Sequence, residues 1–275
     1  MQVAVSAVVF TKNEEKNIQD CIASLSSFSE IIVVDSMSSD DTKKLALNLE
    51  VKFINFDWDG KYPKKRQWSL DNVNFKNDWI LFVDADERVS EEFVMALTNF
   101  LTKFSKDYAA ASIPIDYYFA GKRLKFGQRP KKTALLRVGK VHFPKINDLG
   151  AEGMGELEGH YQPIISGKTK KFKNAIMHND NDPISTWMVR HINYAKWEAH
   201  LLMNQNTKLE VDASKSGASS LFHGLPLRPL AFFVYSYILK FGFLDGRAGF
   251  DYAFAKTWYY WLSSVIAREK QKNAQ

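Results

Sequence analysis

The 275 residues are 45% apolar and 25% charged, which is the composition of a globular protein and excludes collagen-like and disordered classes. Cys21 is the single cysteine, so a disulfide scaffold is excluded as well. The formal net charge of +6 favours anionic partners such as phosphates, nucleic acid or acidic lipid. The length fits one large α/β domain or a domain with a substantial appendix.

The first ten residues form a short alternating apolar run without a basic side chain. This pattern is typical of a buried strand and not of a signal peptide. No uncharged apolar segment is as long as a membrane-spanning helix, which needs about 18 residues. We therefore expect a cytoplasmic protein.

The first hundred residues alternate strand and helix patterns, as parallel strands joined by crossover helices do. We expect strands over residues 3–10, 30–34, 51–56 and 79–83. Asn13 is expected to cap the helix that follows the first strand. Ser90 is expected to cap a later helix, whose apolar face would hold Phe93, Val94, Leu97, Phe100, Leu101 and Phe104.

Polar side chains follow three of these strands at the point where each strand ends. Because parallel sheets bind ligands at the carboxyl ends of their strands, residues 11–14, 35–39 and 84–88 are candidate site segments. Asp84 and Asp86 form an Asp-x-Asp pair after a buried strand, which favours a divalent cation such as Mg²⁺ or Mn²⁺. A solvated turn is the other interpretation of so short a motif.

Three ordered motifs carry a family resemblance. The first strand ends in Thr-Lys-Asn-Glu-Glu-Lys-Asn at 11–17, the second in Val-Val-Asp-Ser at 33–36, and the fourth runs into Asp-Ala-Asp-Glu-Arg at 84–88. Together they resemble the family 2 glycosyltransferases of the GT-A fold. The resemblance implies an α/β architecture, with a mostly parallel sheet flanked by helices.

The resemblance also implies a binding site for a nucleotide-diphosphate sugar. Its donor-binding residues would be Thr11, Asn13, Glu14, Asp35, Ser36, Lys65, Arg66, Gln67, Asp84 and Ala85. Asp35 would accept a hydrogen bond from the base, while Arg66 and Gln67 would touch base and diphosphate. Independently of the family, the cations at 61–66 are either a counter-charge for a diphosphate or a solvated helix end.

The same resemblance implies a metal centre. Asp86 would bind Mg²⁺ or Mn²⁺, with Asp84 as a second ligand. His178 follows an apolar run and would be a third ligand, as a late histidine is in several GT-A enzymes. A structural histidine is the alternative.

An inverting transfer needs a carboxylate that takes the proton of the acceptor hydroxyl. The glycine-rich acidic stretch at 150–159 is expected to be a mobile loop over a site. Glu158 is the first candidate, because it resembles the loop acid of the lipopolysaccharide-core branch, and Glu156 is the second. Asp148 and Glu152 are further candidates, and each of these acids is otherwise a solvated loop charge.

The region after residue 225 is rich in aromatic residues with basic neighbours, a composition typical of a membrane interface. Its segment 242–250, Gly-Phe-Leu-Asp-Gly-Arg-Ala-Gly-Phe, resembles a segment near the end of lipopolysaccharide-core glucosyltransferase-like proteins. The alternatives are a helical cap on the sheet or a dimer interface.

These observations predict a GT-A domain over 1–220, with a nucleotide-sugar half at 1–105 and an acceptor half at 106–220, and a helical extension over 221–275. The expected activity is metal-dependent inverting transfer from a UDP-sugar to a lipid-linked or cell-envelope glycan. The expected place is the inner face of the cell membrane, on anionic lipid and without nucleic acid. A nucleotidyltransferase and a non-catalytic basic membrane-binding adaptor are the rival interpretations.

Overall fold

A computed structural model describes residues 2–158, 161–179, 183–213 and 227–273. The chain forms two compact units, and each consists of three segments. Unit 1 contains Met1–Tyr117, Pro130–Phe143 and Pro163–Asn179; unit 2 contains Tyr118–Arg129, Pro144–Gln162 and Asp180–Gln275. The predicted boundary at residue 220 lies outside the described residues and stays a prediction.

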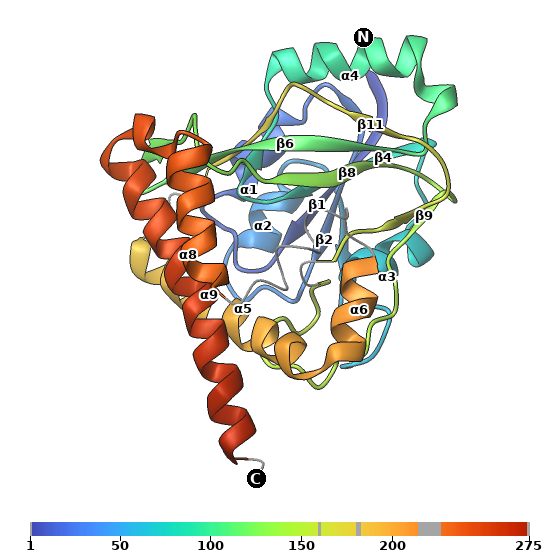
Figure 1. The fold of residues 1–275 in the computed structure, drawn as a ribbon. Helices are drawn as coiled ribbons and strands as arrows, with labels where there is room; N and C mark the ends of the chain where they lie inside the picture. Colours follow the sequence, from blue (N-terminus) through green and yellow to red (C-terminus); the bar gives the residue numbers. More distant parts are fainter. Residues whose placement is uncertain (1, 159–160, 180–182, 214–226, 274–275) are drawn as a thin grey trace. The chain divides into compact units, whose positions relative to one another are not determined.

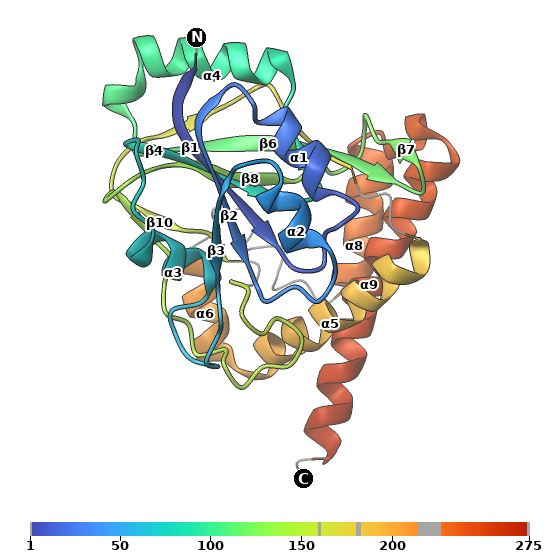
Figure 2. The same ribbon diagram turned by 180° about the vertical axis from the view of Figure 1, so that it is seen from behind.

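Four parallel strands form one half of the sheet in unit 1, in the order β3-β2-β1-β4. They are β1 (Val3–Thr11), β2 (Phe28–Asp35), β3 (Lys52–Asn55) and β4 (Trp79–Asp84). The four predicted strands are therefore present, with ends shifted by one or two residues. The register pairs Thr11 with Asp35 and Phe10 with Asp84, so the polar strand ends meet at one edge (Figure 2).

The other half of the sheet continues from β4 in the order β8-β6-β12-β5. Its strands are β8 (Lys131–Arg137), β6 (Ala110–Phe119), β12 (Ile176–His178) and β5 (Glu87–Arg88). β8 is antiparallel to both β4 and β6, and β12 is parallel to β6. β12 also pairs antiparallel with β5, which places His178 opposite Glu87.

Three shorter strands complete unit 1. β11 (Thr169–Lys171) pairs with β6, whereas β9 (Val141–His142) and β10 (Ile164–Ile165) form a separate two-stranded ribbon. The helices of this unit are α1 (Ile18–Ser24), α2 (Thr42–Leu47), α3 (Lys65–Asn72), α4 (Glu91–Lys103) and the 3₁₀ turn η1 (Ser105–Asp107). This mostly parallel sheet flanked by helices confirms the expected fold class.

Helix α4 has the predicted N-cap, since the Ser90 hydroxyl accepts a hydrogen bond from the Phe93 amide at 3.2 Å. Phe93, Leu97 and Phe100 are buried on its apolar face. Phe104 is the C-cap residue after the last helical residue and is 42% exposed, so its inclusion in the apolar face of the helix was wrong.

The predicted cap at Asn13 was wrong as well. α1 begins at Ile18 with Asn17 in the N-cap position, and no side chain caps it. Asn13 lies earlier, in the loop after β1, with a φ of 57° in the left-handed region that asparagine tolerates better than most residues. Its side-chain oxygen accepts a hydrogen bond from the Ser39 amide, in the loop after β2.

Unit 2 is built mainly from helices, and the described part of the predicted helical extension over 221–275 belongs to it. The helices are α5 (Ile184–Met203), α6 (Gln205–Ala213), α8 (Arg228–Phe233), the π-helical turn η2 (Val234–Leu239), the 3₁₀ turn η3 (Gly242–Asp245) and α9 (Arg247–Asn273), and the unit also includes the short strand β7 (Lys122–Arg123). α9 packs on both α5 and α8 (Figure 1). No helix in the described ranges is long and apolar enough to cross a membrane.

Candidate active site

The ends of β1 and β2 form a hydrogen-bonded polar layer. The Thr11 hydroxyl donates to the Asp35 carboxylate at 2.7 Å. Lys65, at the start of α3, reaches the same layer: its ammonium donates to the Thr11 carbonyl at 2.8 Å and to the Ser36 hydroxyl at 2.6 Å. The structure thus brings together four of the predicted donor-binding residues. Lys65 is buried, so the interpretation of this helix start as solvated was wrong for this cation.

The loop after β1 is tied to the loop after β2. The Asn13 side-chain oxygen Oδ1 accepts from the Ser39 backbone amide at 2.9 Å, and the Asn13 backbone amide donates to the Ser38 hydroxyl at 2.8 Å. The Glu14 amide donates to the Thr42 hydroxyl at 2.7 Å. Asn13 and Glu14 therefore fix the rim of this edge of the sheet.

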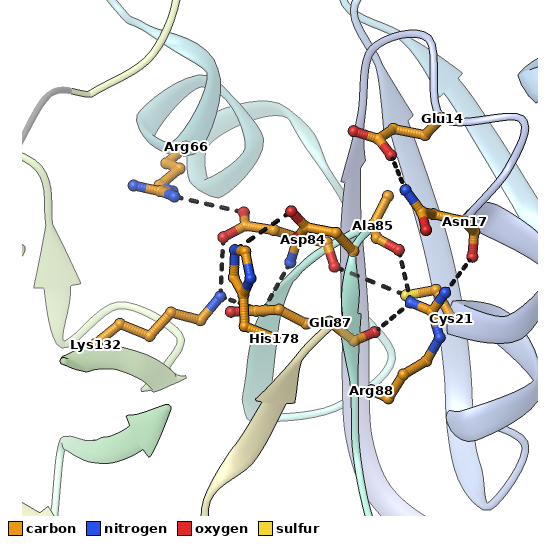
Figure 3. Close-up of polar contacts among 11 residues, drawn as sticks. Glu14, Asn17, Cys21, Arg66, Asp84, Ala85, Glu87, Arg88, Lys132 and His178 are labelled. Carbon is orange, nitrogen blue, oxygen red and sulfur yellow. Dashed lines mark hydrogen bonds and ion pairs between the residues drawn. The ribbon is translucent and has the colours of Figure 1, made fainter. Parts of the chain in front are cut away.

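A network of charges surrounds Asp84 at the end of β4 (Figure 3). The Lys132 ammonium contacts the Asp84 carboxylate at 3.1 Å and also forms a short contact with Glu87. The Arg66 guanidinium lies 3.6 Å from the other Asp84 oxygen. Glu87, only 1% exposed, accepts a hydrogen bond from the Asp84 amide at 2.9 Å.

The charges in this network shift one another's pKa values. Burial would raise the pKa of Asp84, but Lys132 and Arg66 outweigh it and hold that pKa well below its usual range. Burial raises the pKa of Glu87, and Lys132 offsets part of this rise. Burial would lower the pKa of Lys132, yet the two carboxylates raise it. Asp84 is thus held ionised, with both oxygens oriented.

Asp86 and His178 form the second part of the site. The strand pairing of β12 with β5 brings the histidine to the Asp-x-Asp turn, and the Asn179 amide donates to the Asp86 carbonyl at 2.9 Å. The His178 Nε2 atom lies 3.3 Å from an Asp86 carboxylate oxygen. The predicted proximity of these two residues is therefore present in the structure.

Asp84, the remaining predicted metal ligand, has other partners. Asp84 contacts Arg66 and Lys132, and the part of the chain that the structure describes holds no group of three His, Cys, Asp or Glu side chains suited to a metal ion. Asp86 and His178 remain a pair of the right chemistry, a carboxylate oxygen beside an imidazole nitrogen.

Arg88 fixes the backbone of the turn that carries these acids (Figure 3). Its guanidinium donates to the carbonyl oxygens of Ala85 at 2.8 Å and of Glu87 and Asn17 at 2.9 Å. Cys21 lies beside the same turn, and burial raises the pKa of its thiol to about 12, so it is an unreactive packing residue. Ala85, predicted to face the donor, contributes its carbonyl to this arrangement.

Gln67 also has a structural partner. Its side-chain oxygen accepts from the Phe143 amide at 2.6 Å, and its amide nitrogen donates to Asp71 at 2.7 Å. Gln67 therefore connects α3 to the segment after β9.

Sequence reasoning missed Lys132 as a member of the site, and it placed Glu87 and Arg88 in the candidate segment 84–88 without giving either a role. Glu87 and Arg88 stand inside the recognised motif, so their position was a signal for both. Lys132 lies 48 residues from Asp84 in the sequence, at the end of a basic run, and only the pairing of β8 with β4 brings it there.

The four candidate general bases lie in unit 2. Asp148 is buried and accepts from the Trp197 indole at 3.1 Å. Glu152 is exposed and pairs with Lys270 at 3.1 Å and Lys196 at 3.6 Å, and the hydrogen bond from Lys270 lowers its pKa. The hydrogen bond of Asp148 and the ion pairs of Glu152 therefore give both acids a structural role.

Glu158 and Glu156 occupy the glycine-rich stretch. Glu158 is 3% exposed and Glu156 is half-buried, so the first-choice base is not a solvated loop charge. Gly153 has a φ of 104°, and a Cβ there would come within 2.0 Å of the Asn193 carbonyl oxygen, so this stretch packs tightly on α5. Gly159 and His160 lie outside the described residues.

Comparison with protein families matches residues 6–152 to the family described as "Glycosyl transferase family 2". An uncharacterized glycosyltransferase of Rickettsia bellii is 42% identical over 89 residues, which cover 32% of this chain and 29% of that protein. The matches to several Rickettsia relatives span less than half of those proteins. The lipopolysaccharide core biosynthesis glycosyltransferase LpsC of Rhizobium meliloti is 25% identical over 272 residues, 92% of this chain and 90% of LpsC.

Two solved structures are among the similar ones. S. aureus TarS 1–349 aligns with 99% of this chain and 92% of that chain, at 13% identity and a TM-score of 0.43. Glucosyl-3-phosphoglycerate synthase from Mycobacterium tuberculosis, in complex with Mn²⁺, UDP and phosphoglyceric acid, aligns with 41% of this chain and 43% of that chain, at 24% identity and a TM-score of 0.34.

Proposed function

Because the chain belongs to the glycosyl transferase family 2, we propose that it is a metal-dependent inverting glycosyltransferase. The proposed donor is a nucleotide-diphosphate sugar, with UDP as the nucleotide, and the proposed acceptor is a lipid-linked or cell-envelope glycan. Membership of a family of sugar-transferring enzymes sets aside the two rival interpretations, the nucleotidyltransferase and the non-catalytic adaptor.

The observation that carries this proposal is the convergence of carboxylates and cations where three strands end. Thr11, Asp35 and Ser36 form a polar layer with Lys65, and Arg66 lies 3.6 Å from Asp84. A nucleotide-diphosphate sugar has both hydroxyl donors and anionic oxygens, so it needs acceptors and cations side by side. We assign the nucleotide to this layer, with Asn13 and Glu14 at its rim and Gln67 beside the base.

The residues at the Asp-x-Asp turn fit a divalent cation. The imidazole of His178 faces Asp86 at 3.3 Å, and its Nδ1 is buried without a hydrogen-bond partner in the described residues. Phosphate oxygens and water would fill the remaining positions beside this pair, as is usual for Mg²⁺. When bound, Mg²⁺ or Mn²⁺ would supply positive charge beside the leaving diphosphate.

The chain's own cations would share that task. Arg66 would bind a diphosphate oxygen, since its guanidinium presents several donors in a fixed plane. Asp84 is held ionised by Lys132, so it can accept a hydrogen bond from a hydroxyl of the sugar or the ribose. These groups are aligned before the bond to the anomeric carbon breaks, so they stabilise the developing charge without reorganisation.

We assign the general base to Glu158, with Glu156 as the second candidate. Glu158→Gln should lower kcat about 10²-fold, the usual scale for a general base, because the amide cannot take the acceptor proton. Glu156→Gln is the matched control and should change kcat far less. Steady-state kinetics, together with calorimetric UDP binding, measure both effects. If Glu156 has the larger effect, it is the base; if neither variant is impaired, the base is Asp148 or Glu152.

The acceptor and its location are proposed from LpsC, a relative that covers most of this chain. LpsC is named for lipopolysaccharide core biosynthesis and matches 92% of this chain, which supports an envelope glycan as acceptor. Such acceptors are anchored in lipid, so we propose that the enzyme works as a peripheral protein on the inner face of the cell membrane.

A panel of nucleotide sugars tests the proposed function. UDP and one UDP-sugar should raise the melting temperature only with Mn²⁺ or Mg²⁺, by the equivalent of about 2.7 kcal/mol at a hundredfold excess over Kd. Slow hydrolysis of the same donor should need the metal and stop with a chelator. Stabilisation by another nucleotide series, or equal stabilisation without metal, would contradict the assignment.

A further inference from the structure

We propose that unit 2 docks on an anionic lipid bilayer through one face, formed by the exposed side chains of residues 122–126 and 238–244. We call it the docking face. The inference deepens the proposed function and rests on it in one respect, since a lipid-linked acceptor requires the enzyme at a membrane. It differs from the expectation for residues 221–275, because part of the face comes from the middle of the chain.

Hydrogen bonds join the two segments into one surface. The buried Asp245 carboxylate accepts from the amides of Lys125 at 3.0 Å and Phe126 at 2.8 Å. The Lys122 ammonium donates to the Asp245 carbonyl at 2.8 Å, and the Gly127 amide donates to the Lys240 carbonyl at 2.9 Å. Figure 2 shows β7, which holds Lys122, beside the turn that leads into α9.

Large apolar side chains are exposed to solvent on the docking face. They are between 39% and 63% exposed: Phe126, Ile238, Leu239, Phe241, Phe243 and Leu244. Single exposed apolar residues are ordinary, but a contiguous set of this kind marks an interaction site. Five of the six fall within seven consecutive residues, so they project from one short turn.

Phe241 adds an independent indication of function. Its φ is 59°, in the left-handed region where a bulky side chain is disfavoured and glycine is not. The side chain is also more than half exposed, so it does not recover this backbone cost by packing in the core. A strained residue whose side chain lies in solvent is best explained by contact with something outside the chain.

The tight packing of the turn keeps these side chains outside. A Cβ at Gly249 would come within 2.0 Å of the Gly242 carbonyl oxygen, so η3 lies directly against the start of α9. The room beneath the turn is therefore filled by backbone, and the rings of Phe241 and Phe243 are not accommodated there.

Charge identifies the occupant. Lys122, Arg123, Lys125 and Lys240 are exposed on the two segments, which contain no acidic residue between them. The acid that joins the segments, Asp245, is buried and accepts from backbone amides. Rings flanked by cations suit the boundary of an anionic bilayer, where apolar groups insert and each nearby cation adds about 1 kcal/mol of attraction. A second copy of the face would bring cation against cation.

Flotation with lipid vesicles tests the docking face. The full chain should float with vesicles of phosphatidylcholine and phosphatidylglycerol at 7:3, and much less with phosphatidylcholine alone. Phe241→Gly combined with Leu244→Ser should lower the bound-to-free ratio at least tenfold. Val189→Ser combined with Leu209→Ser is the matched control on α5 and α6, where both side chains are equally exposed, and should leave flotation unchanged.

A second pair of variants tests the charge. Lys125→Gln with Lys240→Gln should weaken flotation severalfold and flatten its salt dependence. Lys103→Gln with Lys106→Gln removes the same charge from unit 1 and should have no effect. Phe241→Gly alone should fold at least as well as the parent, because it relieves the left-handed φ, so loss of flotation in that variant is not due to unfolding.

Three results would overturn the inference: a parent chain that stays unbound, equal losses in the docking and control variants, or a dimer in lipid-free solution that Phe241→Gly converts to monomer. Metal-dependent UDP binding, measured by calorimetry on every variant, should stay the same. Failure of flotation with intact UDP binding contradicts the docking face alone, whereas absence of UDP binding in the parent contradicts the proposed function.

Discussion

Asp86→Asn should lower the rate of sugar transfer about 10³-fold while leaving the fold intact. The amide has nearly the same volume as the carboxylate but no charge, so the site loses several kcal/mol of cation-mediated stabilisation in the transition state. His178 would stay in place, because strand pairing with β5 positions it. The measurement is kcat at saturating Mn²⁺ and, separately, Mg²⁺, with circular dichroism as the check on folding.

Asp107→Asn is the matched control for this prediction. It makes the same chemical change at an exposed position of η1, remote from the Asp-x-Asp turn in the sequence and on another element. It should retain full activity. Turnover of Asp86→Asn within a few-fold of the parent, with either metal, would show that Asp86 holds no catalytic cation.

Lys132→Met should lower the free energy of unfolding by about 3 kcal/mol at pH 7. It removes the cation between Asp84 and Glu87 and leaves two carboxylates close together, one of them fully buried. Glu87→Gln in the same variant should restore part of the loss, because it removes the buried unpaired charge. Urea denaturation of the parent, both single variants and the double variant measures this coupling.

The loss in Lys132→Met should shrink as the pH falls. Burial already raises the pKa of Glu87, and without Lys132 it rises further, so Glu87 becomes neutral first in the folded variant. The parent changes in the opposite direction, since the lowered pKa of Asp84 provides stability that is lost below its ordinary value of 3.8. A deficit below 0.5 kcal/mol, or one equal at pH 7 and pH 4.5, would contradict a charge-pairing role.

The parallel half of the sheet could be predicted because its signals are local. Each strand of that half is a short apolar run with a polar residue at its end, and the register then brings Asp35 beside Thr11 and Asp84 beside Phe10. Even the approach of His178 to Asp86 was implied by the family resemblance. These predictions needed only the pattern along the chain and the rule for the functional edge of a parallel sheet.

What could not be predicted depends on pairing between distant segments. Lys132 enters the site because β8 runs antiparallel to β4, and nothing in the basic run around it marks that partner. Asp245 is a second example. Its carboxylate accepts hydrogen bonds from backbone amides about 120 positions earlier in the chain. Local periodicity carries no information on such contacts, so the charged network and the docking face became visible only in three dimensions.

The interleaving of the two units has a consequence for biosynthesis. Unit 1 is not finished when its Asp-x-Asp turn has been made, because β12 and His178 belong to the third segment of that unit. At ordinary translation rates the histidine emerges about 5 to 20 seconds after Asp86. During that interval Asp86 lacks the imidazole of His178, and β6 lacks its parallel partner β12. The growing chain is therefore expected to acquire UDP affinity late, in a single step once β12 has left the ribosome, and not gradually as the motifs appear.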